Sequence, residues 1–89
     1  MAPGKAQYHA HLGGLLTKTG DLAGAEAAIR EAIGLDAERA GFHHSLGHVL
    51  RKAGRIDEAI AEQRRATLLD GGDPRYSAAL DSLIKRRRS

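Results

Sequence analysis

Residues 12–36 decide the fold, and they read LGGLLTKTGDLAGAEAAIREAIGLD. The same pattern returns 34 residues later in residues 46–70, which read LGHVLRKAGRIDEAIAEQRRATLLD. The two stretches align without a gap, and a fixed spacing of this length is typical of repeat proteins whose stacked units share one core. The matched positions include Leu12 with Leu46, Gly13 with Gly47, Leu16 with Leu50, Gly20 with Gly54, Ala25 with Ala59, Ala32 with Ala66 and Asp36 with Asp70.

The spacing of apolar residues predicts two helices in each unit. Residues recurring every three or four positions indicate helices over about 5–18, 22–35, 39–53 and 56–69. Gly20 and Gly54 are expected to end the first helix of each unit, because glycine readily adopts the left-handed backbone found there. Asp21 is expected to cap the helix that follows it. The dipeptide Asp73-Pro74 predicts the start of a fifth helix that runs to about residue 86.

The predicted core consists of one apolar stripe per helix. The small residues Gly13 and Ala25 indicate that the two helices of the first unit approach each other closely. The second unit keeps this plan but has Gln63 where the first has Ile29. The stripe predicted for the first helix is Tyr8, Leu12, Leu15, Leu16 and Thr19, and that of the second is Leu22, Ala25, Ile29, Ala32 and Ile33.

Length and composition restrict the class of protein. A chain of 89 residues forms one domain with a thin core. It contains no cysteine, which excludes disulfides and thiolate metal sites. No segment resembles a signal peptide or has the roughly 20 apolar residues that cross a bilayer. We therefore expect a soluble cytoplasmic protein, or a soluble segment of a larger one, and no membrane partner.

The 34-residue period, the helix–turn–helix plan and the small residues at the helix crossings resemble the tetratricopeptide repeat. This resemblance implies an all-α, right-handed solenoid of five helices within a single domain, 1–89. The first repeat would cover about residues 6–39 and the second about residues 40–73, followed by a closing helix over about 74–87. The sequence departs from the family where His9 and His43 replace the usual aromatic residue.

The resemblance also implies a concave groove, lined by the first helix of each unit and by the closing helix, that binds peptides. The residues expected to line it are Gln7, Ala10, Gly14, Thr17, Lys18, Gly41, His44, His48, Arg51, Lys52, Arg75, Ala78, Ser82, Lys85 and Arg86. This set is basic and contains no acid, which favours an acidic peptide or a carboxylate terminus. The simpler interpretation is that the lysines are ordinary solvated charges.

The family's best-known groove, the carboxylate clamp for chaperone tails, is not expected in this chain. The clamp requires Lys, Asn and Arg at five positions, and this sequence has none of the required residues there. Those positions hold Ala10, Gly14, His48, Ala78 and Ser82.

We therefore predict a non-catalytic scaffold that binds a protein or peptide. No cofactor is expected, and no nucleophile stands in a catalytic arrangement. One alternative is self-association through the first helix, around Tyr8 and Leu15. Another is a segment appended to a larger enzyme.

Two further ligand classes are less favoured. His44 and His48 lie four residues apart, on one helical face, but lack neighbouring residues that complete a metal site. The basic run Lys85–Arg88 suits phosphates, but no aromatic residue is interleaved with it for base stacking. The run is equally suited to the negative end of a helix dipole.

Overall fold

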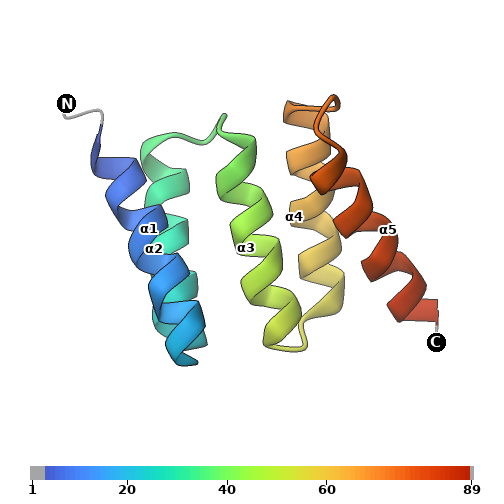
Figure 1. The fold of residues 1–89 in the computed structure, drawn as a ribbon, viewed down its shortest axis with the longest axis horizontal. Helices are drawn as coiled ribbons and strands as arrows, with labels where there is room; N and C mark the ends of the chain where they lie inside the picture. The colour runs from blue at the N-terminus through green and yellow to red at the C-terminus, as the bar shows by residue number, and fades with distance from the viewer. Residues whose placement is uncertain (1–3, 89) are drawn as a thin grey trace.

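A computed structural model describes residues 4–88, and these residues form five α-helices with no strand (Figure 1). The helices are α1 (Gly4–Thr19), α2 (Leu22–Leu35), α3 (Ala40–Lys52), α4 (Ile56–Leu69) and α5 (Pro74–Arg88). The predicted all-α fold class is confirmed, and the predicted bounds of α2 and α4 match those of the structure. No helix within residues 4–88 has the length and apolar character that crossing a membrane requires.

The helices form two stacked hairpins and a closing helix (Figure 1). Helix α1 packs on α2, α3 packs on α4, and the hairpins meet mainly where α2 contacts α3. Helix α5 packs on α4 at the end of the stack. The molecule measures 42 × 29 × 16 Å, so it is a thin helical-repeat solenoid in which few side chains are fully enclosed.

The turns within the hairpins form as the repeated residues predict. Gly20 and Gly54 have φ angles of 90° and 80°, in the left-handed region that favours glycine. The side chain of Asp21 caps α2 by accepting a 2.9 Å hydrogen bond from the backbone N–H of Gly24. Asp73 caps α5 in the same way, accepting a 2.9 Å bond from the N–H of Arg75.

Small residues bring the helices of each hairpin together. Ala25 and Ala32 on α2 are fully buried, as are their counterparts on α4. A Cβ atom added to Gly13 would lie only 2.5 Å from Cγ1 of Ile29, so α1 reaches α2 at this point because the glycine has no side chain. The glycine and alanines that recur 34 residues apart are thus those that allow close packing.

The apolar stripe predicted for the first helix is partly wrong. Tyr8 and Leu15 are 63% and 48% exposed, and Thr19 is exposed as well. Helix α1 instead buries Ala6 and Gly13. The reason is its position at the end of the stack: α1 packs on α2 and α3, where Leu16 contacts the core, and the side of α1 that carries Tyr8 and Leu15 faces outward.

Polar side chains tie the two hairpins together. The His43 ring is buried, with Nδ1 2.8 Å from a carboxylate oxygen of Glu62 and Nε2 2.8 Å from the carbonyl oxygen of Ala37. It therefore joins α3 to α4 and to the connection between the hairpins. Arg55 bonds Glu26 of the first hairpin at 2.6 Å.

Candidate functional site

Among residues 4–88, side chains of α1, α3 and α5 line three hollows on the face where the sequence predicts a groove. The largest lies between α1 and α3 and has a volume of about 430 Å³. A second, of about 350 Å³, lies near the starts of the three helices. A third, of about 90 Å³, lies between α3 and α5. His44 lines all three, so α3 is the central element of the groove.

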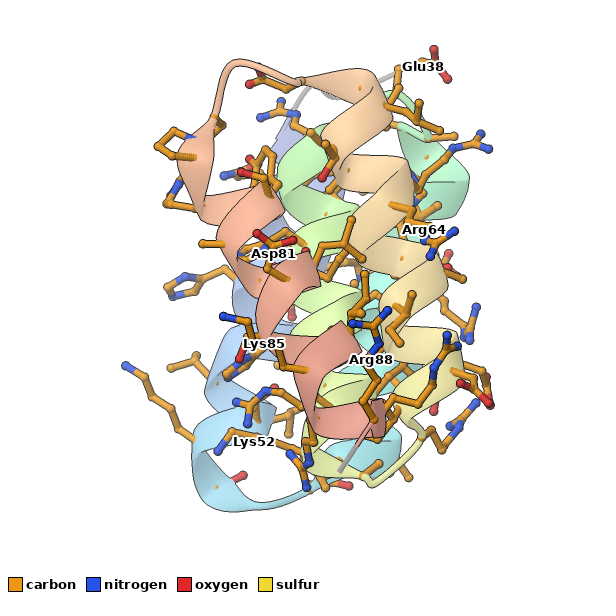
Figure 2. The ribbon with its side chains drawn as sticks, turned by 90° about the vertical axis from the view of Figure 1, so that its right-hand side faces the viewer. Glu38, Lys52, Arg64, Asp81, Lys85 and Arg88 are labelled. Atoms are coloured by element: carbon orange, nitrogen blue, oxygen red, sulfur yellow. The ribbon has the colours of Figure 1, made fainter. Side chains whose placement is uncertain are left out.

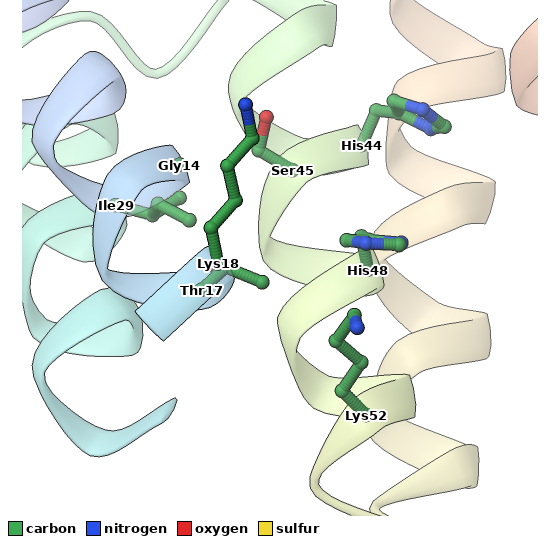
Figure 3. Close-up of a pocket in the computed structure, with 8 residues that line it drawn as sticks. All are labelled: Gly14, Thr17, Lys18, Ile29, His44, Ser45, His48 and Lys52. Atoms are coloured by element: carbon green, nitrogen blue, oxygen red, sulfur yellow. The ribbon is translucent and has the colours of Figure 1, made fainter. Parts of the chain in front are cut away.

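The largest hollow brings together side chains from both hairpins (Figure 3). Gly14 and Lys18 of α1 line one side, and His48 and Lys52 of α3 line the other. Ile29 reaches the hollow from α2. Figure 3 shows Lys18 extending along the space beside α3.

The other predicted groove residues divide between the two smaller hollows. Gln7 lines the second hollow together with Arg75, and Arg51 lines the third together with Ser82. Lys85 lines none of the three. Figure 2 nevertheless shows Lys85 and Lys52 on the same side of the molecule, opposite Arg64.

The His44 side chain is held by its neighbours in one orientation. Gln63 of α4 donates its amide N–H to the backbone carbonyl of His44 at 3.1 Å. Its amide oxygen therefore faces the ring and accepts a hydrogen bond from Nδ1 of His44 at 2.9 Å. The ring also packs against Tyr76 of α5, with centroids 5.0 Å apart. The structure thus fixes His44 between α4 and α5.

His48 is surrounded by positive charge. A guanidinium nitrogen of Arg51 lies 3.2 Å from its Nδ1, which therefore accepts the hydrogen bond. Partial burial lowers the pKa of His48 below its ordinary value, and the charges of Arg51, Lys52 and His44 lower it further. A negative ligand placed here would favour the protonated ring.

The predicted basic character of the groove arises from a division of charge between the helices. Helices α1 and α3 contain no Asp or Glu, whereas α2 and α4 carry five: Glu26, Glu31, Asp57, Glu58 and Glu62. No carboxylate lines any of the three hollows. Within residues 4–88, Lys18, Arg51 and Lys52 form no ion pair with a carboxylate.

The proposed metal pair lacks further ligands. No group of three or more His, Cys, Asp and Glu side chains gathers within residues 4–88. The Arg51 guanidinium also occupies the Nδ1 side of His48, and a fixed cation opposes the binding of a second one. Within residues 4–88, His44 and His48 therefore have no third ligand beside them.

Sequence reasoning missed several residues of this face. Ser45 lines two of the hollows, and Arg39 and the mostly buried Tyr76 line the second. Ser45 directly follows His44 in the sequence, so the set of expected groove residues would have included it if it had been widened by one residue on α3. Tyr76 is harder to find, because its position follows from how α5 crosses α3.

Comparison with known proteins identifies the family of this chain. A comparison with curated proteins found no match. A family model described as tetratricopeptide repeat matches residues 2–83, which is nearly the whole chain. Together with the paired helices, the repeated turn glycines and the helix that ends the stack, this match shows that the chain belongs to the tetratricopeptide repeat family.

Proposed function

We propose that this protein is a non-catalytic interaction module that binds an acidic peptide segment in the groove formed by α1, α3 and α5. Tetratricopeptide repeats generally mediate protein–protein interactions. The observation that carries the proposal is the division of charge described above. All three hollows lack a carboxylate. Lys18 and Lys52 line the largest hollow and Arg51 lines the third, and none of them has an acidic partner within residues 4–88. Such a surface favours encounters with negatively charged partners and raises their association rate.

Charge reversal tests this proposal. The probe is a fluorescein-labelled peptide, Glu-Glu-Leu-Glu-Glu, compared with Gln-Gln-Leu-Gln-Gln by fluorescence anisotropy at fixed salt. The double variant Arg51→Glu with Lys52→Glu should weaken binding of the acidic peptide by at least about tenfold, since each reversed charge contributes on the order of 1 kcal/mol near a surface. The glutamine peptide should bind weakly to all variants.

A matched control separates groove charge from net charge. Arg64 and Arg65 are adjacent, exposed residues of α4, on the outer helix of the second hairpin. Arg64→Glu with Arg65→Glu changes the net charge by the same amount and should leave binding nearly unchanged. If both double variants lose the same affinity for the acidic peptide, binding depends on the total charge of the protein, and the proposal that the groove binds the peptide is refuted.

A second candidate function, self-association through α1, is supported by the exposure of Tyr8 and Leu15. These side chains are seven residues apart and therefore lie on one side of the helix, with the half-buried Leu12 between them. Leu15→Glu should then convert an oligomer to a monomer in sedimentation velocity experiments. A wild-type protein that remains monomeric at about 100 μM, far above the micromolar range of specific dimers, would refute this candidate.

A further inference from the structure

Gly14 forms part of the wall of the hollow between α1 and α3. No heavy atom lies within 4 Å of the place where a Cβ of Gly14 would be, so the space in front of it is open. The equivalent residue of the second unit is His48, whose side chain stands on the groove face. The two hairpins therefore differ at this groove position, and the smaller residue leaves room beside α1.

Carbon atoms form the inner part of this hollow. Ile29, which is 1% exposed, reaches it from α2 because Gly13 lets the two helices approach each other closely. The hydroxyl of Thr17 already donates a 2.8 Å hydrogen bond to the carbonyl of Gly13, so it does not require a polar partner. An apolar group entering the hollow past Thr17 would therefore leave this hydroxyl satisfied.

The rim of the same hollow is cationic. Lys18 stands on the α1 side and Lys52 on the α3 side, and neither forms an ion pair with a carboxylate among residues 4–88. Lysine keeps its ammonium group in water while its alkyl chain covers apolar surface. The hollow thus combines an apolar interior with a positive rim.

We propose that this hollow is a specificity pocket that accepts one apolar side chain of an acidic peptide, with acidic residues on both sides of it. This proposal rests on the proposed function and names the sequence class of the partner: acidic, apolar, acidic. The apolar side chain enters in front of Gly14 and packs toward Ile29, and the flanking carboxylates meet Lys18 and Lys52. A volume of about 430 Å³ is enough for a leucine or phenylalanine side chain.

The test uses two labelled peptides that differ at one residue, Glu-Glu-Leu-Glu-Glu and Glu-Glu-Gly-Glu-Glu. Wild-type protein should bind the leucine peptide about tenfold more tightly, the fold-change expected for burying most of one aliphatic side chain. Gly14→Leu fills the pocket from the protein side and should bring this ratio close to one. The ratio is the readout because both peptides contact the same cationic rim, so an effect of the variant on the rim alters both affinities alike.

Gly34→Leu is the matched control. Gly34 is exposed on α2, and no heavy atom lies within 4 Å of its absent Cβ. Its counterpart in the second unit is Leu68, which is 83% exposed, so the fold already carries a leucine at this place. Gly34→Leu should keep the wild-type preference for the leucine peptide.

A second readout locates the bound side chain. With the isoleucine methyl groups labelled with ¹³C, the Ile29 resonance should move when the leucine peptide is added and stay in place with the glycine peptide. An affinity ratio of one in the wild-type protein, or a preference that survives Gly14→Leu, would overturn the pocket while leaving the groove intact. Failure of both peptides to bind would instead refute the proposed function itself.

Discussion

Gly13 and Gly14 are neighbours in sequence, yet their missing side chains have different consequences. Gly13 faces α2, where its absent Cβ would lie 2.5 Å from Ile29 Cγ1 and 3.3 Å from the carbonyl oxygen of Ala25. Gly14 faces the open hollow. Only the first position has a neighbour that resists a larger residue.

We therefore expect opposite effects from the same substitution. Gly13→Ala should destabilise the fold by about 1–3 kcal/mol, because both the isoleucine branch and the backbone of α2 must move. Gly14→Ala should be neutral or stabilise by up to about 1 kcal/mol, since alanine favours the helix and meets no obstacle. Urea denaturation followed by circular dichroism measures both. Equal destabilisation in the two variants would contradict the packing at Gly13.

For Gln63, the sequence predicts burial of the side chain but not its hydrogen bonds. The repeat register makes Gln63 the equivalent of Ile29 in the first unit, and both side chains are buried, Gln63 to 2% exposure. Its two hydrogen bonds to His44, one to the ring and one to the backbone, were not predicted. They depend on the distance between α3 and α4, which periodicity does not give.

Among the helices, the ends were predicted well and the exposed faces less well. Local signals set the ends: Gly20 and Gly54 adopt left-handed backbone, and Asp21 and Asp73 accept capping hydrogen bonds. Burial along α1 depends on what packs against it, so a pattern of large residues did not identify its buried side. The helix presents Leu15 outward and packs inward through Gly13.

The cap of α5 predicts a loss of stability in acid. The side chain and backbone N–H of Arg75 bond the Asp73 carboxylate and lower its pKa from 3.8 to about 2. Because this pKa is depressed in the folded state, the stabilisation is present above pH 3.8 and disappears as the pH falls toward about 2. Asp73→Asn keeps an oxygen to accept the N–H bond but removes the titration.

Urea midpoints measured at intervals between about pH 5 and about pH 2 should fall less steeply in Asp73→Asn than in the wild type, over the window set by this carboxylate. Asp81→Asn is the control. Asp81 lies on the exposed side of α5 and makes no hydrogen bond or ion pair within residues 4–88, so this variant should keep the wild-type slope. An identical slope in Asp73→Asn would show that the cap does not contribute to acid stability.

At the scale of the whole molecule, the order of the helices determines which face carries acidic residues and which does not. Acidic residues are confined to α2, α4, α5 and the connections, and the stacking of hairpins turns the acid-free α1 and α3 toward one face. The 34-residue register puts Lys18 and Lys52 at equivalent positions of α1 and α3, so the sequence predicts a cation on each of these helices. The three hollows depend instead on side-chain placement around Gly14, His44 and Tyr76, which no sequence pattern specifies.

This arrangement predicts that binding of an acidic peptide is linked to proton uptake at His48. In the free protein, partial burial first and then the charges of Arg51, Lys52 and His44 lower the pKa of His48. Gln63 of α4 and Ser82 of α5, which line the same hollow, add no opposing charge. Carboxylates of a bound peptide favour the imidazolium and raise this pKa. Because the complex then holds the proton more tightly than the free protein does, the affinity must rise as the pH falls.

The dissociation constant of Glu-Glu-Leu-Glu-Glu should therefore decrease severalfold between about pH 8 and about pH 6, a range in which the peptide carboxylates stay ionised. His48→Gln should flatten this dependence. His9→Gln is the control, since His9 lies on α1 and lines none of the three hollows. Isothermal titration calorimetry in buffers of different ionisation enthalpy gives the number of protons taken up directly. If wild-type protein takes up no protons on binding, or if His48→Gln takes up as many as wild type, the peptide carboxylates do not lie beside His48.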